Sequence, residues 1–362
     1  MYSMKQLERT KVKHRDITWD IAKGIGILLV VIGHSGCPIY LHNLIYLFHM
    51  GLFFFISGIF LPPPYRHPGN STLIGKPSEW FIFVKKKIKR LYLPFVFYGT
   101  VGVLFHNLLC SIGWNRTQYS YIEIVEKLLG TLLFKDVESQ FMIFWFLKSL
   151  FFGLLITYSL HLLVSSKKCQ FLIILILYTL GYTCSYLNKH LFFSIEREMV
   201  VLCTIWLGSV CRPVISGGKI SILSRTKIPW ISAVVILLLS AFIVKIDVAI
   251  SDFSFYMAYP LYSLIGVYVI YIASKVCKNS WFGKTMAFWG RHSMDILIFH
   301  IIGMQLLSTV MVVLGIASFA NLWQVPTIVE LIGTLWFIPY TLSGLLFPLC
   351  IEYIKKMIIN RL

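Results

Sequence analysis

The chain has 362 residues, of which 57% are hydrophobic and only 13% are charged. A soluble domain carries roughly 25% charged residues, so the composition and the mean hydropathy of +0.77 argue against a soluble enzyme. Apolar runs of about 20 residues, each long enough to cross a bilayer as a helix, recur from end to end. Alternating ten-residue segments, which mark an outer-membrane barrel, are absent from the sequence. The sequence therefore predicts an all-α polytopic membrane protein.

The formal net charge of +18 does not indicate nucleic-acid binding, because the basic residues stand in short connections between apolar runs. Such placement controls membrane topology. The eight cysteines form no C-x-x-C pair, so neither a disulfide framework nor a zinc site is indicated. The basic start and the apolar run after it resemble a signal peptide, but no small-x-small cleavage site follows. We interpret this run as the first membrane helix.

About ten spans are expected, packed as one bundle in a single membrane domain over residues 1–362, with a cytoplasmic N-terminal segment 1–16 and a cytoplasmic tail 355–362. The predicted spans are 17–37, 42–61, 91–110, 141–164, 170–188, 196–212, 228–246, 254–275, 293–315 and 327–354. Connections on one side of these spans hold 25 Lys and Arg residues and those on the other side hold six. Because basic loops stay on the cytoplasmic side, both termini are predicted to be cytoplasmic, in the cell (inner or cytoplasmic) membrane.

The opposite side carries most of the acidic residues. They are Glu123, Glu126, Asp136, Glu138, Glu196, Glu198, Asp247 and Asp252. Two interpretations remain open for them: ordinary solvated loops, or a surface that binds a hydroxyl-rich acceptor.

The first span contains ionisable residues, which cost about 2.5–3.5 kcal/mol each on insertion scales. Lys23 and His34 are eleven residues apart. That spacing is nearly three helical turns, so both project from one face, about 16–17 Å apart along the axis. A cation at the mouth and an imidazole deeper in the membrane would match the phosphates and the thioester of acetyl-CoA. The alternatives are a snorkelling Lys23 paired with Asp20 and a His34 that is only hydrogen-bonded within the bundle.

The second span begins near His49, a second intramembrane imidazole that a short connection joins to His34. The two imidazoles are candidates for a pair of general bases, or for a base and the residue that orients it. A metal site is a competing interpretation. It lacks a third clustered ligand, because His42 lies in the predicted connection and no acidic residue accompanies it. No metal is expected.

Five segments together are similar to acyltransferase family 3, the integral-membrane O-acyltransferases that acetylate carbohydrates. They are WDIAKGIGILLVVIGH (19–34), FHMGLFFFISG (48–58), KKKIKRLYLPF (85–95), FWFLKSLF (144–151) and WGRHSMDILIFH (289–300). The chain departs from the family pattern at Gly51, at Lys148 and at Met294-Asp295. The AKGIG segment, with lysine where arginine is the alternative, resembles the stand-alone, fucose 4-O-acetylase-like branch.

The resemblance implies transfer of an acetyl group from cytoplasmic acetyl-CoA to a hydroxyl of a surface glycan or its lipid-linked precursor. Lys23 and His34 occupy the positions of the essential pair. The expected partners are acetyl-CoA, a carbohydrate or lipid-linked acceptor and membrane lipids, without nucleic acid. Lys148 is interpreted either as a further contact to CoA or as a snorkelling side chain.

Four further residues have a functional and a structural interpretation each. Arg90 and Arg291 are candidates for holding the nucleotide phosphates, for which guanidinium geometry is suited, or for topogenic and lipid contacts. His300 is a candidate substrate-binding residue or a packed, hydrogen-bonded histidine. Trp145 is a candidate sugar platform or part of an interfacial aromatic belt.

Two other classes of function are weighed against the enzyme. A transporter of a glycan or small polar solute would predict paired interrupted helices and repeat symmetry, and the sequence pattern indicates neither. A structural scaffold would leave Lys23, His34 and His49 unexplained. The membrane O-acetyltransferase is therefore the favoured hypothesis, with His34 and His49 as catalytic residues.

Overall fold

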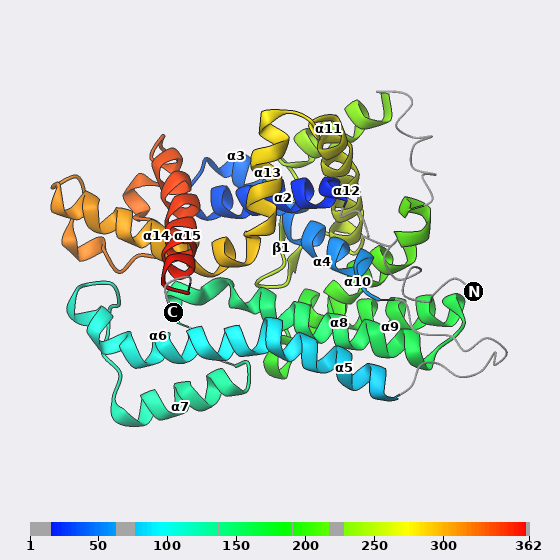
Figure 1. Ribbon diagram of the computed structural model, residues 1–362, viewed down its shortest axis with the longest axis horizontal. Coiled ribbons are helices and arrows are strands. Elements are labelled where there is room, and N and C mark those ends of the chain that lie inside the picture. Colours follow the sequence, from blue (N-terminus) through cyan, green and yellow to red (C-terminus); the bar gives the residue numbers. More distant parts are fainter. Residues whose placement is uncertain (1–15, 63–76, 136–137, 190, 217–227, 360–362) are drawn as a thin grey trace, which may run out of the picture.

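A computed structural model describes residues 16–62, 77–135, 138–189, 191–216 and 228–359 (Figure 1). The N-terminal segment 1–15, most of the Pro-rich loop, Asp136 and residues 360–362 lie outside the described residues. The helices are α2 Ile17–His34, α3 Ile39–Tyr46, α4 His49–Ile59, α5 Pro77–Lys87, η1 Ile88–Tyr92, α6 Leu93–Ser111, α7 Tyr121–Leu132, η2 Ser139–Phe144, α8 Trp145–Leu163, α9 Lys167–Tyr186, η3 Phe192–Ser194, α10 Ile195–Ser216, α11 Ile228–Ser240, α12 Ala258–Val276, α13 Trp281–Arg291, α14 Ser293–Val313, η5 Phe319–Asn321, η6 Val329–Leu331 and α15 Phe337–Ile359.

Nine helical segments of the described part are long and apolar enough to cross a membrane. This confirms the predicted all-α polytopic architecture. The predicted span 228–246 is wrong in length: α11 ends at Ser240 after 13 residues, which is about 20 Å of helix against a hydrocarbon core of about 30 Å. The chain turns there, with the Val244 N–H donating to the Ser240 carbonyl at 2.8 Å. The loop that follows contains the two-stranded antiparallel hairpin β1 Ile246–Asp247 and β2 Asp252–Phe253.

Three other predicted elements change. The second span is interrupted at Leu47–Phe48, so α4 begins at His49 and His42 belongs to α3 rather than to a loop. The last span begins at Phe337 instead of residue 327, because the chain before it forms short 3₁₀ turns. The predicted connection 275–292 contains the helix α13, whose apolar residues pack against α2.

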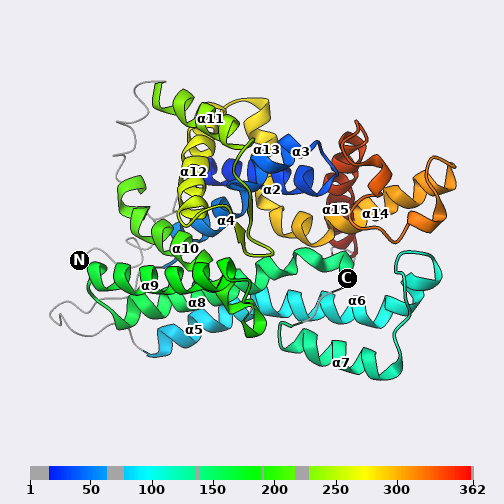
Figure 2. The ribbon, with the colours of Figure 1, turned by 180° about the vertical axis from the view of Figure 1, so that it is seen from behind.

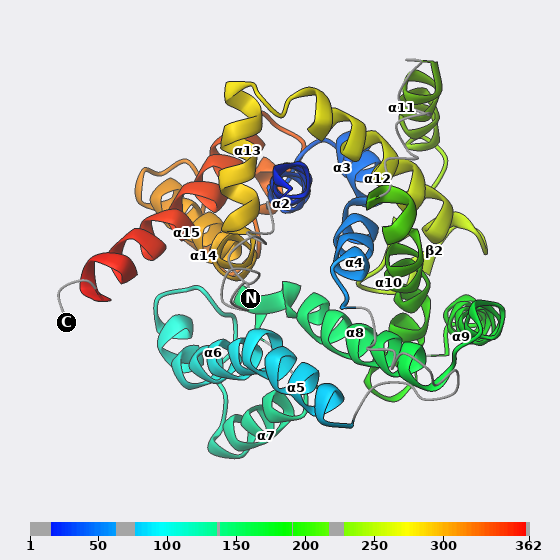
Figure 3. The ribbon, with the colours of Figure 1, turned by 45° about the vertical axis from the view of Figure 1, so that its right-hand side comes forward.

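The helices lie in two groups. In Figures 1 and 2, α5, α6, α8 and α9 run along one side of the molecule and α2, α4, α12 and α14 along the other. Figure 3 looks nearly down α2, with α13 and α14 on one side of it and α3, α4 and α12 on the other. The helix that carries Lys23 and His34 is therefore central to its group, and 11 of its 18 residues are buried. We call its two ends the Lys23 end and the His34 end.

Glycines bring α2 and α13 into backbone contact near the Lys23 end. A Cβ built on Gly24 would lie 1.8 Å from the carbonyl oxygen of Met286, and one on Gly290 would lie 1.8 Å from the carbonyl oxygen of Asp20. Small residues commonly allow such close approach of membrane helices. Sequence reasoning did not identify this contact.

We expect Gly24→Ala to destabilise the protein by at least 1–3 kcal/mol, the usual cost of overpacking, because rigid backbone obstructs the new methyl group. Thermal unfolding in detergent would show the loss as a lower midpoint and a lower yield of monodisperse protein. Gly26→Ala on the same helix is the matched control, since its Cβ would meet only side-chain carbons of Phe53 and Leu52 at 3.0–3.1 Å. Equal midpoints for the two variants would contradict this packing.

Candidate functional site

A cavity of about 180 Å³ lies at the His34 end. Residues from α2, α3, α4, η2, α8 and the β1–β2 hairpin line it. They are His34, Tyr46, His49, Met50, Met142, Ile143, Trp145, Asp247, Val248, Ala249 and Ile250. Three residues predicted from the sequence, His34, His49 and Trp145, thus meet at one cavity. Trp145 lies about a hundred residues after the two histidines in the chain.

The imidazole of His49 is hydrogen-bonded to the backbone of α3, the helix that precedes α4. Its side chain is buried, and Nδ1 lies 2.9 Å from the carbonyl oxygen of Ile45. Because a carbonyl can only accept, Nδ1 carries the proton and Nε2 is left as the acceptor of the neutral ring. The backbone carbonyl of Ile45 therefore orients the His49 ring. A fixed tautomer with a basic Nε2 suits a group that accepts a proton.

His300 is a third imidazole beside this cavity. It is completely buried, and its Nδ1 donates to the carbonyl oxygens of Ile296 at 3.0 Å and Leu297 at 2.9 Å. Its ring centroid lies 5.5 Å from that of His34. Among the described residues, the buried Nε2 of His300 has no hydrogen-bond partner. The structure thus places His300 next to His34, a contact that the sequence alone did not predict.

Sequence reasoning missed two polar residues of the cavity wall. Tyr46 stacks on His42 with ring centroids 3.8 Å apart and lies 4.8 Å from the ring of His49. Asp247 stands on the hairpin, and its Oδ1 accepts from the Ala249 N–H at 2.9 Å. Burial raises the pKa of Asp247 above its ordinary value, and the Ala249 N–H and nearby His42 offset part of that rise. The sequence alone assigns Asp247 only to the acidic group on the side opposite the basic connections.

Trp145 is half-buried and packs against a buried polar network. The guanidinium of Arg197 lies 5.1 Å from the centre of the Trp145 ring, a cation–π contact. Arg197 also donates to the carbonyl oxygen of Ala249 at 2.9 Å and lies 3.4 Å from Glu198. Trp145 is thereby fixed between α10 and the hairpin.

Lys148 and two acidic residues differ from expectation. Lys148 lies in the first turn of α8, which begins at Trp145. Its Nζ is 3.9 Å from Oε1 of Glu198 and donates a hydrogen bond to the Phe193 carbonyl. Lys148 is buried and paired within the protein, so it is not a snorkelling side chain. Glu196 and Glu198 are also buried, with 1% and 5% of their surface exposed, so the solvated-loop interpretation is wrong for both. It holds for Glu123, which is exposed and completes a capping box with Ser120.

The Lys23 end gathers part of the predicted basic mouth. Lys23 is half-buried, and its Nζ lies 4.8 Å from the centre of the Phe60 ring. Arg291 is exposed and follows Gly290, which contacts the backbone of α2 at Asp20 and Gly24. Arg90 is exposed in the π-helical turn η1, which packs against α8. Arg291 therefore lies on α13, which packs against α2, the helix of Lys23. Arg90 lies in η1, which packs against α8 instead.

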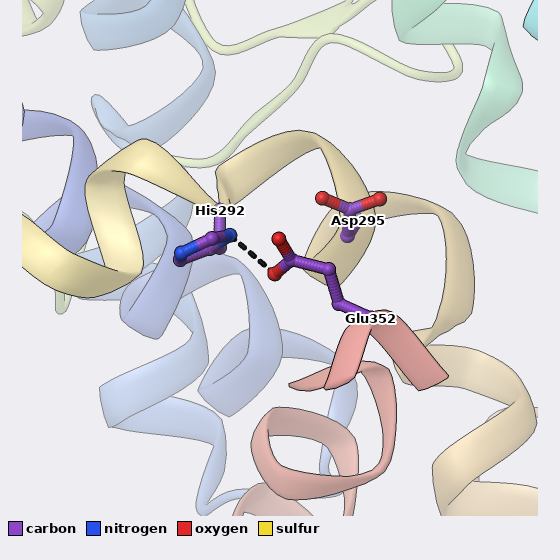
Figure 4. Close-up of side chains that lie close together, drawn as sticks. All are labelled: His292, Asp295 and Glu352. Carbon is purple, nitrogen blue, oxygen red and sulfur yellow. Dashed lines mark ion pairs between the residues drawn. The ribbon is translucent and has the colours of Figure 1, made fainter. Parts of the chain in front are cut away.

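A second polar cluster occurs where α13, α14 and α15 meet. Ligand-type atoms of His292, Asp295 and Glu352 all lie within 4.8 Å of one another, and His292 forms an ion pair with Glu352 (Figure 4). Eight residues, about two helical turns of α14, separate His292 from His300. This cluster, which includes the departure at Asp295, joins the end of α15 to the start of α14 and lies apart from the histidine cavity.

Comparisons with known proteins identify the family. The family model Acyl_transf_3, described as an acyltransferase domain, matches residues 16–353. Neither the curated proteins nor the solved structures gave a match. The match covers the described helices up to residue 353 in α15, and with them the histidine cavity and the Lys23 end. The chain therefore belongs to this family of membrane acyltransferases.

Proposed function

We propose that the protein transfers an acetyl group from acetyl-CoA, bound at the Lys23 end, to a hydroxyl of a surface glycan or its lipid-linked precursor at the His34 end. The observation that carries this proposal is the central helix α2, which has a lysine at one end and a histidine in a shared cavity with His49 at the other. With the Lys23 end on the cytoplasmic side of the cell membrane, donor and acceptor would reach the helix from opposite sides. The AKGIG segment around Lys23 supports the fucose 4-O-acetylase-like branch.

The donor would be held by its phosphates. Lys23 and Arg291, with Arg90 from η1, supply the cationic groups, and the pantetheine arm would follow α2 over about 16–17 Å to His34. Charge-assisted contacts to phosphate are stronger than neutral hydrogen bonds. This arrangement separates the residues that bind the donor from those that carry out the chemistry.

The transfer itself needs a base, because a sugar hydroxyl is a poor nucleophile. His34 takes the hydroxyl proton as the oxygen attacks the thioester carbonyl, the carbon–sulfur bond breaks, and the proton passes to the departing CoA thiolate. The first amide groups of α4, at His49 and Met50 on the cavity wall, have no partner within their own helix and suit the developing oxyanion. His49 and His300 flank His34 and position the base and the acceptor. No step of this sequence requires a metal.

Purified protein in lipid vesicles, given labelled acetyl-CoA and glycan isolated from the source cell, tests the function. We expect label in the carbohydrate, and the same yield when a chelator is present. Hydrolysis of the labelled acetyl-CoA without label in the carbohydrate would exclude glycans as the acceptor class. Movement of the glycan across the vesicle membrane, with no labelled acetyl group on it, would favour a transporter. The interruption between α3 and α4 would then be a feature of that transporter.

We expect the ionisation of Asp247 to determine how kcat/KM falls at acid pH, the acid limb of the pH profile. An ionised Asp247 on the cavity wall favours the imidazolium that forms when a histidine accepts the proton. Because burial raises the pKa of Asp247, this negative charge is lost at a higher pH than for an ordinary carboxyl. We expect Asp247→Asn to lower kcat/KM roughly tenfold at neutral pH, equivalent to about 1.4 kcal/mol, and to move the acid limb to lower pH.

The matched control is Glu126→Gln, which removes the charge of an exposed carboxylate on α7. Glu126 does not line the histidine cavity. The pH profile of kcat/KM distinguishes the two variants. An unchanged acid limb in Asp247→Asn would remove Asp247 from the mechanism.

A further inference from the structure

Two larger cavities adjoin the histidine cavity at the His34 end. One, of about 660 Å³, is lined by Tyr182, Ser185, Tyr186, Asn188, Ser194, Glu196 and residues 249–253 of the hairpin. We call it the tyrosine cavity. It shares Ala249 and Ile250 with the histidine cavity. The tip of the β1–β2 hairpin is therefore a common wall.

The other neighbouring cavity, of about 320 Å³, shares Trp145 with the histidine cavity and Ser194 with the tyrosine cavity. Two of its three cations, Lys148 and Arg197, are engaged with Glu198, and the third, Lys135, is exposed. Arg197 touches Trp145 and the Ala249 carbonyl, so it fixes two of the walls between the cavities. The three cavities therefore neighbour one another around Arg197 and the hairpin tip.

Tyr182 and Tyr186 form an aromatic platform in the tyrosine cavity. They stand one helical turn apart on α9, with ring centroids 6.1 Å apart and an angle of 17° between the rings. Tyr256 braces Tyr182 edge to face at 5.1 Å. The negative faces of such rings attract the C–H groups of a sugar ring. Side chains of Asn188 and Asp252 are exposed beside the platform and offer hydrogen bonds to hydroxyl groups.

The backbone around these cavities is held in an unusual conformation. Within the described part of the chain, the non-glycine residues with positive φ are Phe134, Asn188, Phe193, Ser194 and Ser251, with φ between 52° and 60°. Every one of them lines the tyrosine cavity or its neighbour. Residues in the left-handed region are uncommon outside glycine and cluster at functional sites. The strain thus coincides with the aromatic and polar lining.

We propose that the tyrosine cavity is a subsite for neighbouring sugar units of the acceptor, so that the enzyme acts on an oligosaccharide or polymeric glycan rather than on a free monosaccharide. This proposal rests on the proposed function. The unit to be acetylated occupies the histidine cavity, and the next units pass the hairpin tip and lie against Tyr182 and Tyr186. Asp252 and Glu196 on the lining favour a neutral or amino-sugar chain over an acidic one.

The test measures how KM depends on acceptor length. Glycan from the source cell surface is partially hydrolysed and separated into fractions of one to six units, and each fraction is assayed with labelled acetyl-CoA. We expect KM of the parent protein to fall at least tenfold between one and four units. Tyr186→Ala and Tyr182→Ala should remove this dependence while leaving KM for the single unit and KM for acetyl-CoA unchanged. Tyr182→Phe should retain it, because the ring remains.

Tyr353→Ala on α15 is the matched control, since Tyr353 is 65% exposed and Tyr186 is 73% exposed. This control should keep the parent's length dependence. Length dependence that persists in both alanine variants, or a parent KM that does not vary with length, would overturn the subsite. A parent that acetylates no fraction would instead overturn the proposed function, so the two failures are distinguishable.

Discussion

Replacing His34 with alanine is expected to abolish acetyl transfer while the protein continues to bind CoA. His34 lines the histidine cavity, with its ring centroid 5.5 Å from that of His300. Lys23, which is proposed to hold the CoA phosphates, lies about three helical turns away along α2. General-base catalysis contributes roughly 10²–10⁴-fold, so kcat should fall within that range. Single-turnover transfer of labelled acetyl groups gives the rate, and equilibrium binding of labelled CoA gives the affinity.

His161→Gln is the matched control for His34→Ala. His161 is also a buried histidine of a membrane helix, hydrogen-bonded to Gln170 at 3.0 Å and Ser209 at 2.8 Å. It does not line the histidine cavity. Its rate per folded molecule should stay within about threefold of the parent, since it makes no contact with the reacting groups. A loss smaller than tenfold in His34→Ala would contradict the role of His34.

The same experiment on His49 decides between the two catalytic histidines. His49 has a fixed tautomer with a basic Nε2, which also suits a general base. We expect His49→Ala to reduce the rate less than His34→Ala. An inactive His49→Ala variant beside an active His34→Ala variant would exchange the two roles.

Replacing Lys23 with alanine is expected to weaken binding of CoA about tenfold to hundredfold, with a smaller effect on the rate at saturating donor. Hydrogen bonds to charged groups contribute about 1.5–3 kcal/mol, which corresponds to that range. Lys23→Arg should recover part of the affinity, because the positive charge remains although its geometry changes. Titration of the purified protein with labelled CoA measures the effect.

Lys275→Ala is the matched control for Lys23→Ala. Both lysines make a cation–π contact, Lys275 with Tyr271 at 4.9 Å and Lys23 with Phe60 at 4.8 Å. Lys275 lies at the end of α12 and has no predicted part in donor binding. Parent-like affinity in Lys23→Ala, or equal losses in both variants, would show that Lys23 does not bind the donor specifically.

The sequence by itself determined the features that depend on local composition. Hydropathy and the distribution of Lys and Arg gave the class of protein, most of the spans and the expected orientation, because membrane insertion responds to the average polarity of about 20 consecutive residues. The spacing of Lys23 and His34 placed them on one helix face, because helical geometry is fixed by the backbone. The motif segments indicated the family that the match over residues 16–353 then showed.

Only the tertiary structure decided which distant residues meet at the cavity. His34, Trp145, Asp247 and His300 come from four separate parts of the chain, and no local pattern encodes a contact between helices. The sequence predicted that Lys148 faces lipid or CoA. In the packed structure it is buried and paired with Glu198. An apolar run specifies that a helix is buried but not its neighbours, which depend on the shapes of complete helix faces such as the Gly24–Gly290 contact.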